Sequence, residues 1–190
     1  MRRLALSIVA VASFVAIGSV RAAPAMSEDA CSLVTADQVS AVSGGKVEAG
    51  ERHDSGTGDD GSYSSTCVWK IGGLPPLPPR AEGMPAPFGG SAFAMVNTIT
   101  WPAGSGMAKK YLDDFWKAAK QHDIDMTPVP VKAGDDALFW GDGVAMRKGD
   151  VAFGVSVHIG SDKKAEQSME EALARKIIAN YEDKAAPVGH

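Results

Sequence analysis

Four histidines are the side chains of this sequence best suited to bind a metal or to transfer protons near neutral pH. Zinc motifs place paired ligands about two to five residues apart, whereas these histidines are separated by much longer stretches of chain. The sequence therefore predicts no metal site and no cofactor. The four residues are His53, His122, His158 and His190.

Ser156 and His158 are the nearest approach to a nucleophile and its base, within Gly154-Val155-Ser156-Val157-His158. Serine hydrolases hold the nucleophile in a Gly-x-Ser-x-Gly elbow, and the second glycine is missing here. Side chains two residues apart on a strand point in parallel, so the serine is not aimed at the histidine. We predict no catalytic residues; the alternative hypothesis is an exported hydrolase-like enzyme whose site is assembled from scattered residues.

Two acidic groups also have the composition of a functional site. Asp135 and Asp136 could act as paired carboxylates, but adjacent residues of an extended chain point in opposite directions, and Gly-Asp-Asp before Ala137 is typical of a turn. The segment 54–61 is rich in aspartate and glycine, but it lacks the alternating acids and closing glutamate of a helix-loop-helix calcium site. Both groups are predicted to be surface turns or loops.

Cys31 and Cys67 are the two cysteines of the chain, and we predict that they form one disulfide. Closing a loop of this length stabilises a fold by about 3 to 4 kcal/mol in the chain-entropy model. The bond also indicates an oxidising compartment.

The N-terminus has the three parts of a secretory signal peptide. Basic Met1-Arg2-Arg3 precedes an apolar stretch over residues 4–20, and small residues allow cleavage after residue 22 or 25. We expect residues 1–22 to be removed, 23–30 to form a polar lead-in, and the protein to be periplasmic or secreted. The apolar stretch is short and interrupted, so no membrane span is expected, and no cysteine stands at the cleavage site to carry a lipid.

The charge of the chain limits its partners. The formal net charge is −4 at pH 7, and removing the signal peptide, with three arginines and no acid, makes it more negative. Lysine and arginine are dispersed among acids, whereas a nucleic-acid-binding protein presents a basic patch. Nucleic acid is therefore excluded as a partner, and an unknown envelope protein or a small apolar ligand is expected.

Residues 151–159 form the clearest core strand, because large apolar residues alternate with small or polar ones. With segments 138–140 and 144–147 it predicts a three-stranded antiparallel meander. Other strands are expected over 46–49, 66–71 and 91–101, and 127–131 is expected to be either an edge strand or a plain connector. In 91–101, a second core strand, Phe93, Met95, Ile99 and Trp101 are expected on one face, interrupted only by Asn97.

Three helices are predicted to pack against this sheet. Thr35 and Gln38 have the spacing of a capping box, and the glycines at 44–45 end that helix. The other two helices span 107–122 and 165–181. Their apolar stripes are Met107, Tyr111, Phe115, Ala118 and Ala119 in the first, and Met169, Leu173, Ile177 and Tyr181, with Ala172 and Ile178, in the second. The predicted fold class is α+β, with a mostly antiparallel sheet, about three helices and one disulfide, in a single domain over 31–182 followed by a tail over 183–190.

Two segments interrupt this domain, 50–65 and 72–90. The first has almost no apolar residues and is predicted to be a mobile loop. The second holds six prolines and five glycines, so it can be neither a helix nor a central strand. Its apolar side chains suggest that it contacts a partner, covers a pocket or docks as a polyproline segment. These side chains are Leu74, Leu77, Met84 and Phe88.

The four tryptophans are the remaining candidates for a binding site. They could line a shared pocket for an apolar ligand, although aromatic residues on strands and helix stripes mostly belong to the core. They are Trp69, Trp101, Trp116 and Trp140.

Several short motifs resemble those of one protein family. They are Cys31-Ser32-Leu33-Val34-Thr35 before a short helix, Cys67-Val68-Trp69 after a loop, Gly134-Asp135-Asp136-Ala137 before a meander, and a closing Ala-Leu-Ala-rich helix. The pattern is similar to a family of exported, often lipid-anchored bacterial proteins of unknown function, and this chain departs from it in lacking the lipid-attachment cysteine and in carrying segment 72–90. The resemblance implies export and this fold, with no catalytic residues. We expect an exported, non-catalytic cell-envelope protein that binds a protein partner or an apolar small molecule.

Overall fold

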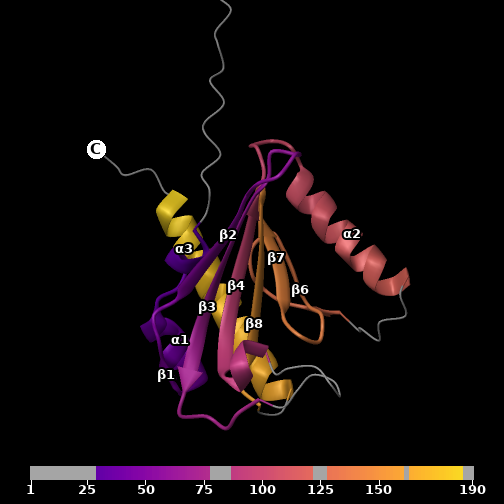
Figure 1. Ribbon diagram of the computed structural model, residues 1–190. Coiled ribbons are helices and arrows are strands. Elements are labelled where there is room, and N and C mark those ends of the chain that lie inside the picture. The colour runs from indigo at the N-terminus through magenta and orange to yellow at the C-terminus, as the bar shows by residue number, and fades with distance from the viewer. Residues whose placement is uncertain (1–28, 78–86, 122–127, 161–162, 186–190) are drawn as a thin grey trace, which may run out of the picture.

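In the computed structural model, residues 29–77, 87–121, 128–160 and 163–185 are described, and they form one antiparallel sheet with helices on both faces (Figure 1). The strand order is β1-β3-β4-β8-β7-β6-β5, with β2 also paired to β3. This confirms the α+β class, the three helices and the disulfide. The expected signal peptide lies outside the described residues, and within those residues no helix is long and apolar enough to cross a membrane.

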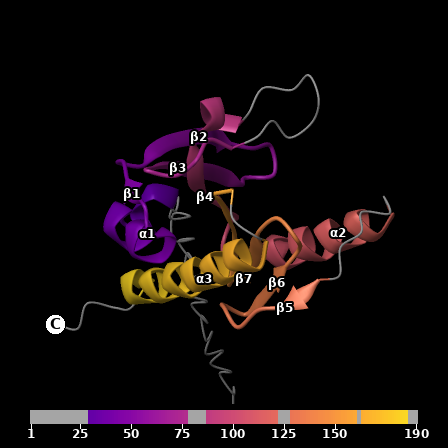
Figure 2. The ribbon, with the colours of Figure 1, turned by 90° about the horizontal axis from the view of Figure 1, so that it is seen from below.

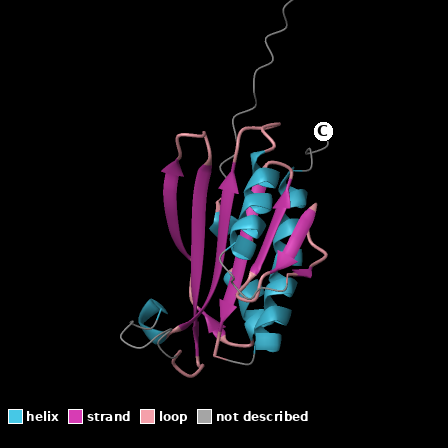
Figure 3. Ribbon diagram, turned by 90° about the vertical axis from the view of Figure 1, so that its right-hand side faces the viewer, coloured by secondary structure: helices cyan, strands magenta, loops and turns pink. Residues whose placement is uncertain are grey.

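The helices are α1 Ala36–Ser43, α2 Met107–Gln121 and α3 Lys163–Ala185, with short 3-10 helices η1 Ala30–Ser32 and η2 Pro87–Gly90. The strands are β1 Lys46–Val47, β2 Glu51–Thr57, β3 Tyr63–Gly72, β4 Ala92–Thr100, β5 Val129–Pro130, β6 Asp136–Phe139, β7 Val144–Lys148 and β8 Val151–His158. The helices α1 and α3 lie side by side over one face of the sheet (Figure 2), and α2 lies over the other face (Figure 3).

The first helix begins and ends where its sequence predicts. The Thr35 hydroxyl accepts from the backbone N–H of Gln38, and the Gln38 side chain accepts from the backbone N–H of Thr35, which completes the capping box. At the other end Gly44 has φ of 73°, a left-handed conformation that costs glycine little.

Strand β8 is the core strand that its alternation predicts. Val151, Phe153, Val155 and Val157 are all buried in the main core, together with Ile159. They pack beneath α3, whose Leu173, Ala174, Ile177 and Ile178 are buried in the same core, whereas Met169 and Tyr181 lie at its margin.

The prediction of a mobile loop over 50–65 is wrong, because β2 occupies most of the first half of this segment. β2 pairs antiparallel with β3 along its length, with a bulge between Asp54 and Gly56. Its side chains are nearly all exposed, so it shows no apolar alternation. Backbone pairing and the Arg52 guanidinium, which contacts Asp29, Asp54 and Tyr63, supply the order that apolar burial does not.

Strand β4 is the core strand that its alternation predicts, but both of its faces are covered and the main core lies on the face opposite to Phe93. Ala92, Ala94 and Val96 are the residues of β4 that enter the main core, whereas Phe93 and its neighbours at alternate positions lie on the α2 face of the sheet. The physical reason is that β4 is central and covered on both faces, so side-chain size alone does not identify the face beneath α3.

Helix α2 keeps part of the expected stripe, since Met107 packs on the second core and Phe115 is half-buried, but its fully buried residues among those described lie one position along. Ala108 and Leu112 are buried, while Tyr111 is 41% exposed and Ala118 faces solvent. Ala108 packs with Trp101 and Ala152 in a small second core. The ring of Tyr111 rests on the outer side of that contact, 5.5 Å from the ring of Trp101.

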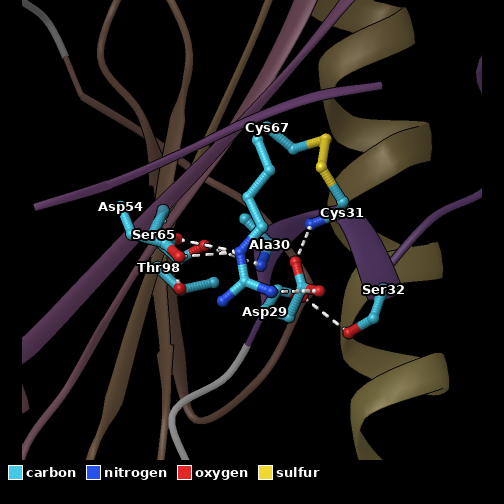
Figure 4. Close-up of a disulfide and its surroundings, with 9 residues drawn as sticks. Asp29, Ala30, Cys31, Ser32, Asp54, Ser65, Cys67 and Thr98 are labelled. Carbon is cyan, nitrogen blue, oxygen red and sulfur yellow. Dashed lines mark hydrogen bonds and ion pairs between the residues drawn. A yellow bond between two sulfur atoms is a disulfide. The ribbon is translucent and has the colours of Figure 1, made fainter. Parts of the chain in front are cut away.

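The predicted disulfide joins Cys31 to Cys67, whose Cα atoms are 5.0 Å apart (Figure 4). It attaches η1 to the middle of β3. The same junction is held by a hydrogen bond from the backbone N–H of Ala30 to Oγ of buried Ser65, 3.2 Å long, and by the Arg52–Asp29 ion pair. The start of the described chain is therefore attached to the sheet through one covalent bond and several polar contacts.

We expect Cys67→Ser to lower the free energy of unfolding by about 3 to 4 kcal/mol, because the unfolded chain loses a cross-link over 36 residues. For a domain of this size the melting temperature should fall by about 10 °C in a thermal unfolding experiment. The double variant Cys31→Ser/Cys67→Ser controls for the thiol that the single change leaves. Two thiols that react with an alkylating reagent in the native protein would contradict the bond.

Candidate functional site

An apolar groove lies between α2 and the outer face of the sheet. It consists of two cavities of about 420 and 130 Å³, which share Ala145 of β7. We call this the α2 groove. Its apolar lining is Leu112, Trp116, Pro130, Ala137, Leu138 and Ala145 in the larger cavity, and Ile99, Tyr111, Phe115, Trp140, Ala145, Ala152 and Phe153 in the smaller.

The groove follows from the size of the side chains on its two walls. The sheet wall is shallow because β8 presents Ala152 and Gly154 here, and a Cβ at Gly154 would overlap the side-chain amide of Asn97. The helix wall carries Phe115, whose ring lies 5.9 Å from that of Trp140 in an edge-on contact. Large rings opposite small residues hold α2 away from the sheet, which leaves space between them.

The charged side chains that line the groove are already paired. Lys109 lies 2.8 Å from Asp113, and its hydrogen bond lowers the pKa of that carboxyl. Asp135 and Asp136 both contact Arg147, at 3.1 and 2.6 Å. A charged ligand would have to compete with these pairs, so the groove is better suited to a neutral molecule.

The tryptophans divide between core and groove. Trp69 and Trp101 are 2% and 4% exposed and belong to the core. Trp116 and Trp140 are half-buried and line the two cavities of the α2 groove. Of the four tryptophans considered for a shared pocket, Trp116 and Trp140 therefore line the α2 groove and the other two do not.

The structure does not bring the considered catalytic residues into one cleft. His158 packs its ring against Phe93, 4.8 Å away, at the end of β8 farthest from Asp135 and Asp136. Ser156 lies on the same face of β8, opposite Met95 of β4. Asp135 and Asp136 are therefore out of reach of His158, whose acidic neighbour is instead Asp142, 3.9 Å away and also paired with Lys163 at 3.1 Å.

The described residues contain no group of three histidine, cysteine, aspartate or glutamate side chains placed to hold a metal ion. His53 is exposed on β2, and His122 and His190 lie outside the described residues. In the acidic segment 54–61, Asp54 is held by Arg52, whose hydrogen bond lowers the pKa of that carboxyl to about 2. Asp60 accepts from the indole N–H of Trp101 at 2.9 Å.

The motif Gly134-Asp135-Asp136-Ala137 has a structural role, because it contacts the turn between β7 and β8. The backbone N–H of Gly149 donates to Oδ2 of Asp135 at 2.9 Å, which lowers the pKa of that carboxyl. Gly134 has φ of 63°, and a Cβ there would overlap the carbonyl oxygen of Arg147. The motif therefore attaches the loop before β6 to the turn between β7 and β8, as the turn interpretation predicts.

We expect Gly134→Ala to lower the free energy of unfolding by about 2 to 4 kcal/mol, since the new Cβ adds steric overlap to the cost of a left-handed backbone. Gly149→Ala is the matched control, because its φ is 57° and a Cβ there meets nothing within 4 Å. The control should cost about 1 kcal/mol. Equal losses in chemical denaturation of both variants would refute the close-approach explanation.

The residues considered for partner contact in segment 72–90 have different environments. Leu74 packs against the main core, and the backbone N–H of Leu77 donates to the carbonyl of Gly90 at 2.7 Å. Phe88 is 41% exposed, has φ of 49° and rests its ring 4.5 Å from that of Phe93. Met84 lies outside the described residues. Among the described members of this set, Phe88 thus offers the large exposed apolar surface.

Two buried glutamates on α3 were missed by the sequence analysis. Glu166 and Glu170 are 5% and 2% exposed. Glu166 lies about two turns and Glu170 about one turn before Ala174, so they extend the buried stripe of α3 toward its N-terminus. That helical spacing is the signal for their burial in the sequence, although glutamate side chains are seldom buried.

Comparisons with known protein families, with curated proteins and with solved structures find no match to this chain.

Proposed function

We propose that the protein is an exported, non-catalytic binding protein that takes up a small, neutral, apolar molecule in the α2 groove. The observation that supports this best is the groove itself, in which aromatic side chains of α2 and Trp140 face a wall of small residues across open space. Its combined size falls within the range of small-molecule sites, which is roughly 300 to 1,000 Å³.

The paired charges at the rim favour a neutral ligand over an ionic one. Apolar molecules gain about 25 cal/mol for each Å² removed from water, so a ligand that fills the groove needs no charged contact to bind. The separation of His158 from Asp135 and Asp136, at opposite ends of β8, argues against the hydrolase alternative.

We expect the neutral fluorescent probe N-phenyl-1-naphthylamine to bind the native protein and to quench the fluorescence of the groove tryptophans. Ala145→Leu places a larger side chain where the two cavities meet, and it should weaken probe binding at least about tenfold, since it fills the space without removing a lining group. Fluorescence titration measures both effects.

Ala118→Leu is the matched control, because it adds the same side chain on the solvent face of α2. It should leave probe binding unchanged, and thermal unfolding should show that both variants are folded. A native protein that does not bind the probe, or an Ala145→Leu variant that binds it as well as the native protein, would rule out the groove.

A second candidate function is contact with an envelope protein through Phe88. A left-handed backbone is costly for a bulky residue, and here it presents an aromatic ring to solvent. Cross-linking with Phe88→Ala against the native protein distinguishes this function from the first, because the probe titration above does not depend on Phe88.

Export is part of the proposal and rests on the N-terminal sequence, on the resemblance described above and on the oxidised cysteine pair. We expect protein recovered from the cell envelope to begin near Ala23 or Met26 in N-terminal sequencing. Protein that keeps Met1 and stays in a cytosolic fraction would contradict export.

A further inference from the structure

The attachment of α3 to β8 depends on two carboxylates that occupy the place of a neighbouring strand. β7 begins at Val144, opposite Val155, so β8 extends beyond it. There the backbone N–H of Val157 donates to Oε1 of Glu170 at 2.9 Å. The N–H groups of Ile159 and Gly160 donate to Oε1 of Glu166 at 3.0 and 3.2 Å.

The two carboxylates are not equally satisfied. Oε2 of Glu166 lies 3.4 Å from the ammonium of Lys163. Oε2 of Glu170 is buried and has no hydrogen-bond partner in the described structure. A buried carboxylate oxygen without a donor is costly when the group is charged, and much less so when it is protonated.

The charged neighbours of Glu170 come from α3 and from the turn between β6 and β7. Asp142, in the turn between β6 and β7, and Glu166 on α3 are acids, and Lys163 is the cation of the group. Lys163 lies 3.1 Å from Asp142, which also faces His158 of β8 at 3.9 Å. The one nearby ammonium is therefore shared between two other carboxylates.

We propose that Glu170 is a pH-responsive fastener: in its protonated form it holds the N-terminal half of α3 against the end of β8, and its deprotonation loosens that contact. Burial, and next the acids Asp142 and Glu166, raise the pKa of Glu170 to about 7, while the N–H of Val157 opposes the rise. When α3 detaches, water reaches the carboxyl and its pKa returns toward 4.5.

The direction of the effect follows from proton linkage. Between about pH 4.5 and 7 the closed state binds more protons than the open one, so the closed state loses stability as pH rises through this range. Below about pH 4.5 the protonated carboxyl contributes its full stabilisation to the closed state, and above about pH 7 that contribution is lost. From pH 5 to pH 8 the equilibrium constant for opening should rise on the order of 50-fold.

Amide hydrogen exchange of the full chain, followed by NMR at pH 5 and pH 8 and corrected for the intrinsic exchange rate, tests this. The protection of the Val157 amide should fall by about that factor in the native protein and stay nearly constant in Glu170→Gln, which cannot ionise. Glu171→Gln removes one charge from the neighbouring position of α3 and should behave as the native protein does.

A second measurement keeps the test decisive if Glu170→Gln folds poorly. The side-chain carboxyl carbon of Glu170 should titrate near neutral pH, and Asp142→Asn should move that midpoint downward, since a negative neighbour is removed. A midpoint near 4.5, or protection at Val157 that changes equally in Glu170→Gln and the native protein, would overturn the proposal.

Discussion

The two unlike faces of β8 determine how the rest of the molecule is arranged. Large apolar residues on one face, from Val151 to Val157, need a wide cover, and α3 supplies it with a stripe of leucine, alanine and isoleucine. Small residues on the other face bury little area, so α2 contacts them closely near Ala152 and Trp101 and then diverges. A single strand therefore explains both the dense core and the open α2 groove.

The ends of β8 show how the fold satisfies backbone groups where the ladder stops. At one end Asp135 accepts from the turn that connects β7 to β8. At the other, Glu166 and Glu170 accept from amides that have no strand partner on that side. A buried N–H group without an acceptor costs about 1 to 3 kcal/mol, and these carboxyls supply the acceptors. At the end near Val157 the acceptor is Glu170, an ionisable group packed beneath α3, and this links the attachment of the helix to pH.

The N-terminal part of the sheet depends less on apolar burial than the C-terminal part. The side chains of β2 are nearly all exposed, and the strand is held by pairing with β3 and by the contacts of Arg52. An edge strand with charged residues and a bulge also resists pairing with other chains. The disulfide beside it ties η1 to β3, so the polar edge and the core share one anchor.

The sequence by itself determined the features that depend on local or strictly periodic signals. The capping box at Thr35, the meander ending in β8, the stripe of α3 and the pairing of Cys31 with Cys67 all follow from residue spacing or from a count of two. Tertiary structure decided what depends on neighbours. β2 gains its order from β3, β4 is covered on both faces, and the α2 groove arises where Phe115 meets small residues of β8. The burial of Glu170 also depends on a neighbour. β7 starts at Val144, opposite Val155, so the N–H of Val157 is left for Glu170 to accept from.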